Sequence, residues 1–164
     1  MEFFLKEIEQ ALDNGLYFMA LQSALTLPDI CGALQSSNGI AKKQKYVRWY
    51  NKYAKESDSN SLSGEDCYYF RCSCVHQGST QSSDSSYKRI LFLIPNSQIV
   101  MHNNIIDDVL NIDIKIFCSN IISSVRTWEQ KIKDEPNFIR NYDKLLKVYP
   151  NGLPPYIVGF PVIS

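Results

Sequence analysis

The chain has 164 residues, of which 45% are hydrophobic and 21% are charged, and this fits one domain around one hydrophobic core. The 17 Lys and Arg residues balance the 17 Asp and Glu residues, which excludes a uniformly basic nucleic-acid-binding surface but leaves room for a local basic cleft. The start of the chain, MEFFLKEIEQ, lacks the apolar run of a signal peptide, and no segment approaches the roughly 18 apolar residues of a membrane span. We therefore expect a single domain over residues 1–164, cytoplasmic and without membrane contact, whose five cysteines are reduced thiols.

The first third of the chain predicts three helices. Apolar residues recur at helical spacing from Glu2 to about Asn14, and they nearly surround the segment from about Leu16 to Gln35, which should be central and buried. Pro28 lies inside that segment, so we expect either a kinked helix or a helix that ends near Thr26 and a short one that begins at Pro28. Residues 41–56 predict a basic helix whose aromatic residues share one face: Tyr46, Trp49, Tyr50 and Tyr53.

The rest of the chain predicts further helices and a small hairpin. A helix should run from about Gly64 to His76, with Ser63 and Asp66 resembling a capping box and Gly78 ending it. Apolar and β-branched residues on both sides of a Pro-Asn-Ser turn predict a β-hairpin over about residues 88–106. Helical spacing returns over about 106–133 and again over 136–150, and a proline-rich tail, about 150–164, should be extended. The expected fold class is a mainly α helical bundle with a small inserted β-hairpin.

The stretch YYFRCSCVHQGS, residues 68–79, combines an arginine, two cysteines and a histidine, and it admits four interpretations. The first is a metal site, although Cys72 and Cys74 lie about 200° apart around a helix and cannot meet one ion. Cys72 and His76 share a face, but two ligands are too few, and only Cys31 or Cys118 could complete such a site in space.

The second interpretation is a redox pair, which requires two thiols that touch. Cys72 and Cys74 point in different directions on a helix and to opposite faces of a strand. The third interpretation is an ordinary helix end, in which His76 lies near the C-terminal dipole and Arg71 makes a surface salt bridge. In that case Cys67 and Cys74 pack in the core as small hydrophobic residues.

The fourth interpretation is a catalytic pair of Arg71 and His76. Residues five apart on a helix lie about 140° apart and ~7.5 Å along the axis, but helical side chains lean toward the N-terminus, so His76 leans toward Arg71. Histidine titrates near neutral pH, which suits general acid–base work, and a guanidinium can hold a phosphate. Such a pair suits cleavage of a phosphodiester by its own 2′-hydroxyl, without a metal or other cofactor.

The spacing from Arg71 to His76 resembles the R-x4-H motif of the HEPN superfamily, which consists of small helical bundles, many of them metal-independent RNases. The chain also resembles a group of bacterial proteins without an assigned activity, on the stretches ALQSALTLPDICGALQS, KYVRWYNKY, LSGEDCYYFRCSCVHQGS and IKIFCSNIISSVRTWEQ. In many active superfamily members the residue after the arginine is polar, whereas here it is Cys72.

The resemblance implies a homodimer in which the Arg71 and His76 pairs of two subunits face each other. It implies an endoribonuclease acting on RNA in a toxin or phage-defence setting, with an antitoxin or another operon partner. His76 would be the general acid–base and Arg71 the group that stabilises the transition state. The alternative is a catalytically inert dimeric interaction or nucleotide-binding module of the same fold.

Several other residues could join this site. Asp29 follows Pro28 in an apolar segment, where it either caps a helix or pairs with Arg71 or His76. Gln77 and Ser79 adjoin His76 and could contact a phosphate. Glu65 and Asp66 are interpreted as first-turn residues favoured by the helix dipole, and His102, in the expected hairpin, as exposed.

The helix over 41–56 carries a basic surface beside its aromatic residues. Such a surface can hold the backbone of RNA, and its candidate RNA-binding residues are Lys42, Lys43, Lys45 and Arg48. The simpler alternative is a solvated basic face on a helix whose aromatic face lies in the core.

Overall fold

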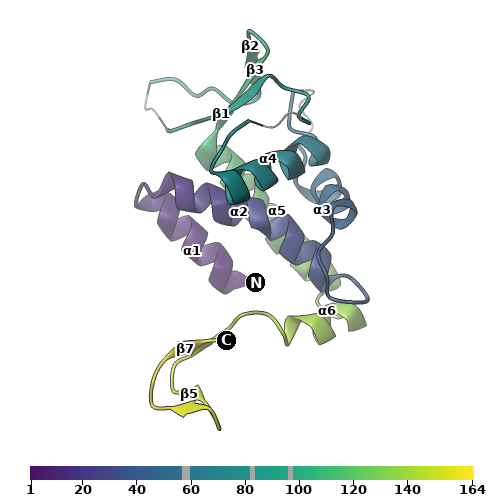
Figure 1. Ribbon diagram of the computed structural model, residues 1–164, viewed down its shortest axis with the longest axis vertical. Helices are drawn as coiled ribbons and strands as arrows, with labels where there is room; N and C mark the ends of the chain where they lie inside the picture. Colours follow the sequence, from purple (N-terminus) through teal and green to yellow (C-terminus); the bar gives the residue numbers. More distant parts are fainter. Residues whose placement is uncertain (57–59, 82–83, 96–97) are drawn as a thin grey trace.

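The computed structural model describes residues 1–56, 60–81, 84–95 and 98–164, and within these ranges it has six α-helices, one π-helical turn and seven short strands (Figure 1). The prediction of a mainly α protein is therefore confirmed. No helix in these ranges is both long and apolar enough to cross a membrane.

The two N-terminal helices are α1 (Glu2–Asp13) and α2 (Tyr17–Leu34). Helix α2 runs without a break through the buried Pro28, so the prediction of two separate segments is wrong. Packing against α1, α3 and α5 holds the helix together where proline removes a backbone donor. Asp29 consequently lies inside a helix and does not cap one, which corrects the capping interpretation.

The basic segment forms α3 (Lys43–Trp49), which continues as a π-helical turn, η1 (Tyr50–Ala54). The expected aromatic face is confirmed for Tyr46, Trp49 and Tyr50, which are buried, while Tyr53 is half-buried. This helix packs closely against α4 (Gly64–Gln77) at Gly64, which has no side chain. A Cβ atom there would lie only 2.7 Å from the Val47 carbonyl oxygen.

Both predicted ends of α4 are confirmed. The Ser63 hydroxyl accepts a hydrogen bond of 3.0 Å from the Asp66 backbone N–H, and it donates one of 2.6 Å to the Asp66 carboxylate. Gly78 has a φ of 63°, the left-handed conformation that glycine adopts most easily, and its N–H donates to the Cys74 carbonyl. The site residues at the end of α4 are therefore held by a well-defined helix terminus.

The small sheet differs from the predicted hairpin over 88–106. Its strands are β1 (Arg89–Leu93), β2 (Asn104–Ile106) and β3 (Val109–Asp113), in the order β1-β3-β2. Strand β1 pairs with β3 in parallel and not with the segment that follows the Pro-Asn-Ser turn, of which Asn96 and Ser97 lie outside the described residues. The composition indicates which segments form strands, but it does not indicate that β1 pairs with β3, farther along the chain.

The hairpin that does form joins β2 to β3 in antiparallel register. Asp107 and Asp108 connect the strands with φ angles of 49° and 62°, which is typical of a two-residue hairpin turn with two left-handed residues. The predicted helix over 106–133 is therefore wrong in its first third. Helix α5 (Ile114–Ile132) begins after β3, where the Asp113 carboxylate accepts from the Ile116 N–H at 3.0 Å.

The last helix, α6 (Pro136–Tyr142), is shorter than the predicted 136–150. The Asn141 amide donates to three carbonyl oxygens at the C-terminal end of α2, those of Ala33, Leu34 and Ser36. These bonds satisfy the free acceptors of a helix end, so α6 fastens the end of α2.

The tail forms two small antiparallel ribbons instead of one extended segment. Strand β4 (Val148–Tyr149) pairs with β7 (Val162–Ile163), and β5 (Gly152–Leu153) pairs with β6 (Ile157–Val158). Figure 1 shows this arm projecting from the helical body beyond α6, at the end opposite the three-stranded sheet.

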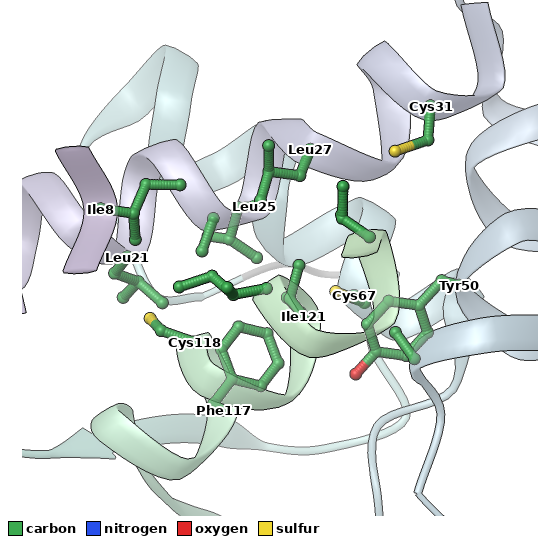
Figure 2. Packing of buried hydrophobic residues seen from close by; sticks show 14 of the residues in the cluster. Ile8, Leu21, Leu25, Leu27, Cys31, Tyr50, Cys67, Phe117, Cys118 and Ile121 are labelled. Atoms are coloured by element: carbon green, nitrogen blue, oxygen red, sulfur yellow. The ribbon is translucent and has the colours of Figure 1, made fainter. Parts of the chain in front are cut away.

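The core lies between α1, α2, α4 and α5, and Figure 2 shows aliphatic residues of α1 and α2 packed over Phe117 and Ile121 of α5. Cys67 and Cys74 are buried there, as predicted for small hydrophobic residues. Tyr46 links three helices: its hydroxyl donates to the Leu25 carbonyl at 3.1 Å and lies 3.2 Å from the Cys67 sulfur. These contacts fix α2, α3 and α4 relative to one another around the candidate site.

Candidate active site

Arg71, His76 and Asp29 meet at the surface between α4 and α2. The Arg71 Nη1 atom lies 3.4 Å from His76 Nε2, and Arg71 Nη2 lies 2.5 Å from Asp29 Oδ2. The long arginine side chain thus spans the 140° separation that the sequence positions impose. With neutral imidazole protonated at Nδ1, the guanidinium N–H donates to the Nε2 lone pair.

The three side chains differ in their exposure. His76 is exposed, whereas the side chains of Arg71 and Asp29 are only 20% and 12% exposed. The Arg71 Nε and Asp29 Oδ2 atoms are both buried without a hydrogen-bond partner in the described part of the chain, so the 2.5 Å contact is an ion pair without good hydrogen-bond alignment. The charged pair is thus mostly buried, and the histidine is exposed to solvent.

Burial and the ion pair act against each other on these two groups. Burial raises the pKa of the Asp29 carboxyl, and the opposing effect of the Arg71 charge is smaller. For Arg71, burial lowers the pKa, but the Asp29 carboxylate and Cys72 together outweigh it and raise the pKa above its usual value. The guanidinium therefore keeps its positive charge, which a phosphate-binding role requires.

Two residues of the same helix, Cys72 and Tyr68, lie near the Arg71 guanidinium. Arg71 Nη1 lies 3.8 Å from the Cys72 sulfur, and the guanidinium carbon lies 6.0 Å from the Tyr68 ring centroid. Cys72 is half-buried. Here it contacts the arginine itself.

Gln77 and Ser79 follow the histidine closely in the chain. Gln77 is exposed on the last turn of α4, and Ser79 is half-buried just past the helix, where its hydroxyl accepts from the Gln81 N–H at 3.1 Å. The Gln77 side chain is therefore presented to solvent beside His76, while the Ser79 hydroxyl already takes part in a turn.

Asp66 has a structural role, in line with its interpretation as a first-turn residue. Besides contacting Ser63, its carboxylate accepts from the Ser86 N–H at 2.7 Å and from the Ser85 hydroxyl at 3.2 Å. The loop after the site is thereby fastened to the start of α4. Glu65, the other first-turn acid, is exposed.

The four basic candidates do not form one surface. Lys43 faces α4, where its amine donates to the Tyr69 hydroxyl at 2.6 Å and lies 5.7 Å from the Tyr68 ring centroid. Since the Arg71 guanidinium also lies close to the Tyr68 ring, Lys43 belongs to the neighbourhood of the site. Lys42 is exposed just before α3.

The other two basic candidates line a different part of the surface. Lys45 and Arg48 border a pocket between α3, the end of α2 and the start of α6, together with Lys52, which sequence reasoning missed. On a helix, Lys43 and Lys45 point about 200° apart, and this separates the two groups.

The prediction that His102 is exposed is wrong. Its side chain is 13% exposed, and its Nε2 atom lies 3.0 and 3.1 Å from the two carboxylate oxygens of Glu56. Glu56 also accepts from the Asn103 amide at 3.1 Å and from the Asn120 amide at 3.4 Å. No local signal in the sequence connects Glu56 to His102, because the contact joins distant segments.

All five cysteines are free thiols. Cys31, Cys67, Cys74 and Cys118 are buried, and Cys72 is half-buried. Burial raises the pKa of Cys67 and of Cys118 to about 12 in each case, which keeps both thiols protonated. Within the described ranges, no three His, Cys, Asp or Glu side chains gather in a way that could hold a metal ion.

No family model, curated protein or solved structure matches this chain. An exposed imidazole beside a fixed guanidinium can exchange a proton with a bound group while a positive charge lies within reach of that group.

Proposed function

We propose that this chain is a metal-independent endoribonuclease built on a HEPN-like helical bundle. The observation that carries the proposal is the 3.4 Å approach of Arg71 Nη1 to His76 Nε2 at an exposed helix end. The R-x4-H spacing and the mainly α fold support it.

In the proposed reaction, RNA supplies its own nucleophile. When RNA binds, the Arg71 guanidinium turns from the imidazole to the phosphate. The freed Nε2 atom of neutral His76 then removes the proton of a ribose 2′-hydroxyl, and the 2′-oxygen attacks the adjacent phosphorus. Arg71 stabilises the added negative charge of the phosphorane. The bond to the 5′-oxygen breaks, that oxygen takes a proton from imidazolium, and the products are a 2′,3′-cyclic phosphate and a 5′-hydroxyl.

The remaining residues would position these two. Asp29 holds the guanidinium through its 2.5 Å ion pair, which limits the directions in which Arg71 can point. Lys43, near the same tyrosine ring as Arg71, would contact the phosphate of a flanking nucleotide. Gln77 beside His76 would donate to a phosphate oxygen, and Ser79 lies two residues farther along the chain.

The proposal includes a homodimer, in which the histidine of one subunit would act as base and that of the other as acid. Such a nuclease fits a toxin or phage-defence setting with an antitoxin or another operon partner. Cross-linking and sedimentation of the purified protein would measure the dimer directly.

The test is RNA cleavage in EDTA by wild type, His76→Ala and Arg71→Ala. General acid–base catalysis contributes about 10²–10⁴-fold, so we expect His76→Ala to lose at least about 100-fold of the rate. The matched control is His102→Gln, which removes the other histidine but can still donate to Glu56, and it should cleave at the wild-type rate. Equal rates for wild type and His76→Ala, or cleavage that EDTA abolishes, would contradict the proposal.

One observation favours a second candidate function, a catalytically inert dimeric interaction or nucleotide-binding module of the same fold. Arg71 is already paired with Asp29, and its side chain is only 20% exposed, so its charge is partly committed within the chain. For this candidate, wild type and His76→Ala would both be inactive on every RNA while dimerising to the same extent.

A further inference from the structure

Three basic residues of α3 and η1, Lys45, Arg48 and Lys52, line a pocket that is not part of the proposed nuclease site. The pocket has a volume of about 390 Å³, within the range of small-molecule sites. It lies between the end of α2, helix α3 with η1, and the residue that precedes α6. Its lining comprises Gly32, Gln35, Ser36, Lys45, Arg48, Trp49, Lys52, Tyr53 and Glu135.

The charge of this lining is strongly unbalanced. Three cations, Lys45, Arg48 and Lys52, face one carboxylate, Glu135. In the described part of the chain none of the three cations forms an ion pair within 4 Å. Unpaired cations that converge on one concave surface attract an anion more strongly than the same charges spread over a convex surface.

The pocket is built from fixed parts. The Lys45 amine donates to the Asn38 side-chain oxygen at 3.0 Å and to the Ile40 carbonyl at 2.7 Å, so its charge is held in place. Gly32 lets α2 approach this lysine, because a Cβ atom there would lie 3.0 Å from the Lys45 Cβ. The carbonyls at the end of α2, which would repel an anion, already accept from residues of α6.

The aromatic wall adds a second feature that points to a ligand. Trp49 is 3% exposed, and its indole N–H is buried without an acceptor in the described part of the chain. A buried donor without a partner costs free energy, and a water or ligand atom is the ordinary remedy. Tyr53 beside it is half-buried, and the Lys52 amine lies 5.0 Å from the centroid of its ring.

We propose that this pocket binds the phosphate of a small phosphorylated molecule. Arg48 and Lys52, both exposed and unpaired, hold the phosphate oxygens, and the fixed Lys45 amine adds charge from the inner side. The organic part of the ligand lies against Trp49 and Tyr53. The site is separate from Arg71 and His76 and does not depend on the nuclease proposal.

The experiment is a calorimetric titration at low ionic strength with three probes: pyrophosphate, adenosine monophosphate and a single-stranded oligouridine. The test variant is Arg48→Gln/Lys52→Gln, and the control variant is Lys6→Gln/Lys115→Gln, which removes the same charge from exposed residues of α1 and α5. All four side chains are exposed, so both variants should fold, and circular dichroism checks this.

We expect pyrophosphate or adenosine monophosphate to bind wild type and the control equally. The test variant should bind at least about tenfold more weakly, because it loses two charge-assisted contacts. His76→Ala should bind like wild type, which separates this site from the nuclease proposal. Failure of both small probes to bind wild type, or an equal loss in the control variant, would overturn the proposal. Binding of oligouridine without either small probe, weakened in the test variant but kept in His76→Ala, would assign the pocket to nucleic acid and would overturn the proposal as well.

Discussion

The two histidines of this chain lie in opposite surroundings. His76 is exposed at a helix end, 3.4 Å from a guanidinium nitrogen, and its ring is open to solvent. His102 is mostly buried, and both oxygens of Glu56 lie within 3.1 Å of its Nε2 atom. A carboxylate that also binds Asn103 and Asn120 makes His102 part of a network that joins distant segments, whereas His76 has a charged neighbour and free access. The comparison separates a histidine that holds structure from one that is available for chemistry.

The largest loss of stability should come from removing Glu56, the shared acceptor of His102, Asn103 and Asn120. Glu56→Ala takes away the acceptor of His102 and of the buried Asn103 amide, whereas the Asn120 amide keeps its hydrogen bond to the Ala54 carbonyl. We expect the free energy of unfolding to fall by about 2–4 kcal/mol, measured by urea denaturation. Glu7→Ala, on the exposed face of α1, serves as the control and should change it by less than about 0.5 kcal/mol. A loss below that limit for Glu56→Ala would show that the network is not structural.

The ion pair between Arg71 and Asp29 should contribute less to the free energy of unfolding, but still a measurable amount. Arg71→Met leaves the Asp29 carboxylate mostly buried without its partner, and we expect a loss of about 1–3 kcal/mol in the free energy of unfolding. Arg126→Met provides the matched control, because Arg126 pairs with Glu2 and Glu9 at side chains that are at least 40% exposed, where such pairs contribute about 0–1 kcal/mol. Equal losses in the two variants would mean that Arg71 is not anchored as described.

The pH dependence of stability should report the burial of Asp29. Burial raises its pKa above the ordinary value of 3.8 in the folded state, so the folded protein holds this proton more tightly than the unfolded chain does. The contribution of Asp29 to stability is therefore fully present below pH 3.8 and is lost as the pH rises through the folded-state pKa. Unfolding of wild type and Asp29→Asn, followed from pH 3 to pH 7, should show wild type losing stability relative to the variant over this interval. The opposite trend would mean that the Arg71 charge outweighs burial.

The smallest effect on stability should come from His76 itself. His76→Ala removes an exposed side chain and should change the free energy of unfolding by less than about 0.5 kcal/mol, since substitutions at exposed positions rarely do more. His102→Ala, the matched change at the histidine that contacts Glu56, should lower the free energy of unfolding by about 1–3 kcal/mol. Similar losses in thermal or urea unfolding would remove the distinction between the two histidines.

Features set by neighbouring residues could be predicted from the sequence. Ser63 and Gly78 mark the ends of α4 through short-range hydrogen bonds and a left-handed backbone, and both were identifiable from residue type. The placement of Arg71 and His76 on one helix follows from the same local reasoning.

Features that depend on distant segments could not be predicted in the same way. The pairing of β1 with β3 and the contact between Glu56 and His102 join parts of the chain whose proximity is decided by packing. The continuous α2 shows that packing can also override a local signal, here Pro28, and it placed Asp29 beside Arg71 and not at a helix start. The division of the basic residues of α3 between two surfaces is different, because it follows from the roughly 200° that separates Lys43 and Lys45 on one helix, which is a local property.

The most direct test of the central claim is the dependence of cleavage on the ribose 2′-hydroxyl. An RNA oligonucleotide that wild type cleaves in EDTA would be compared with the same sequence carrying a single 2′-deoxy nucleotide before the cleaved bond. We expect cleavage at that bond to stop, and we expect the unmodified RNA to yield 2′,3′-cyclic phosphate ends that His76→Ala does not produce. Cleavage of the deoxy-substituted bond at the wild-type rate would contradict the assignment of Arg71 and His76 to this chemistry.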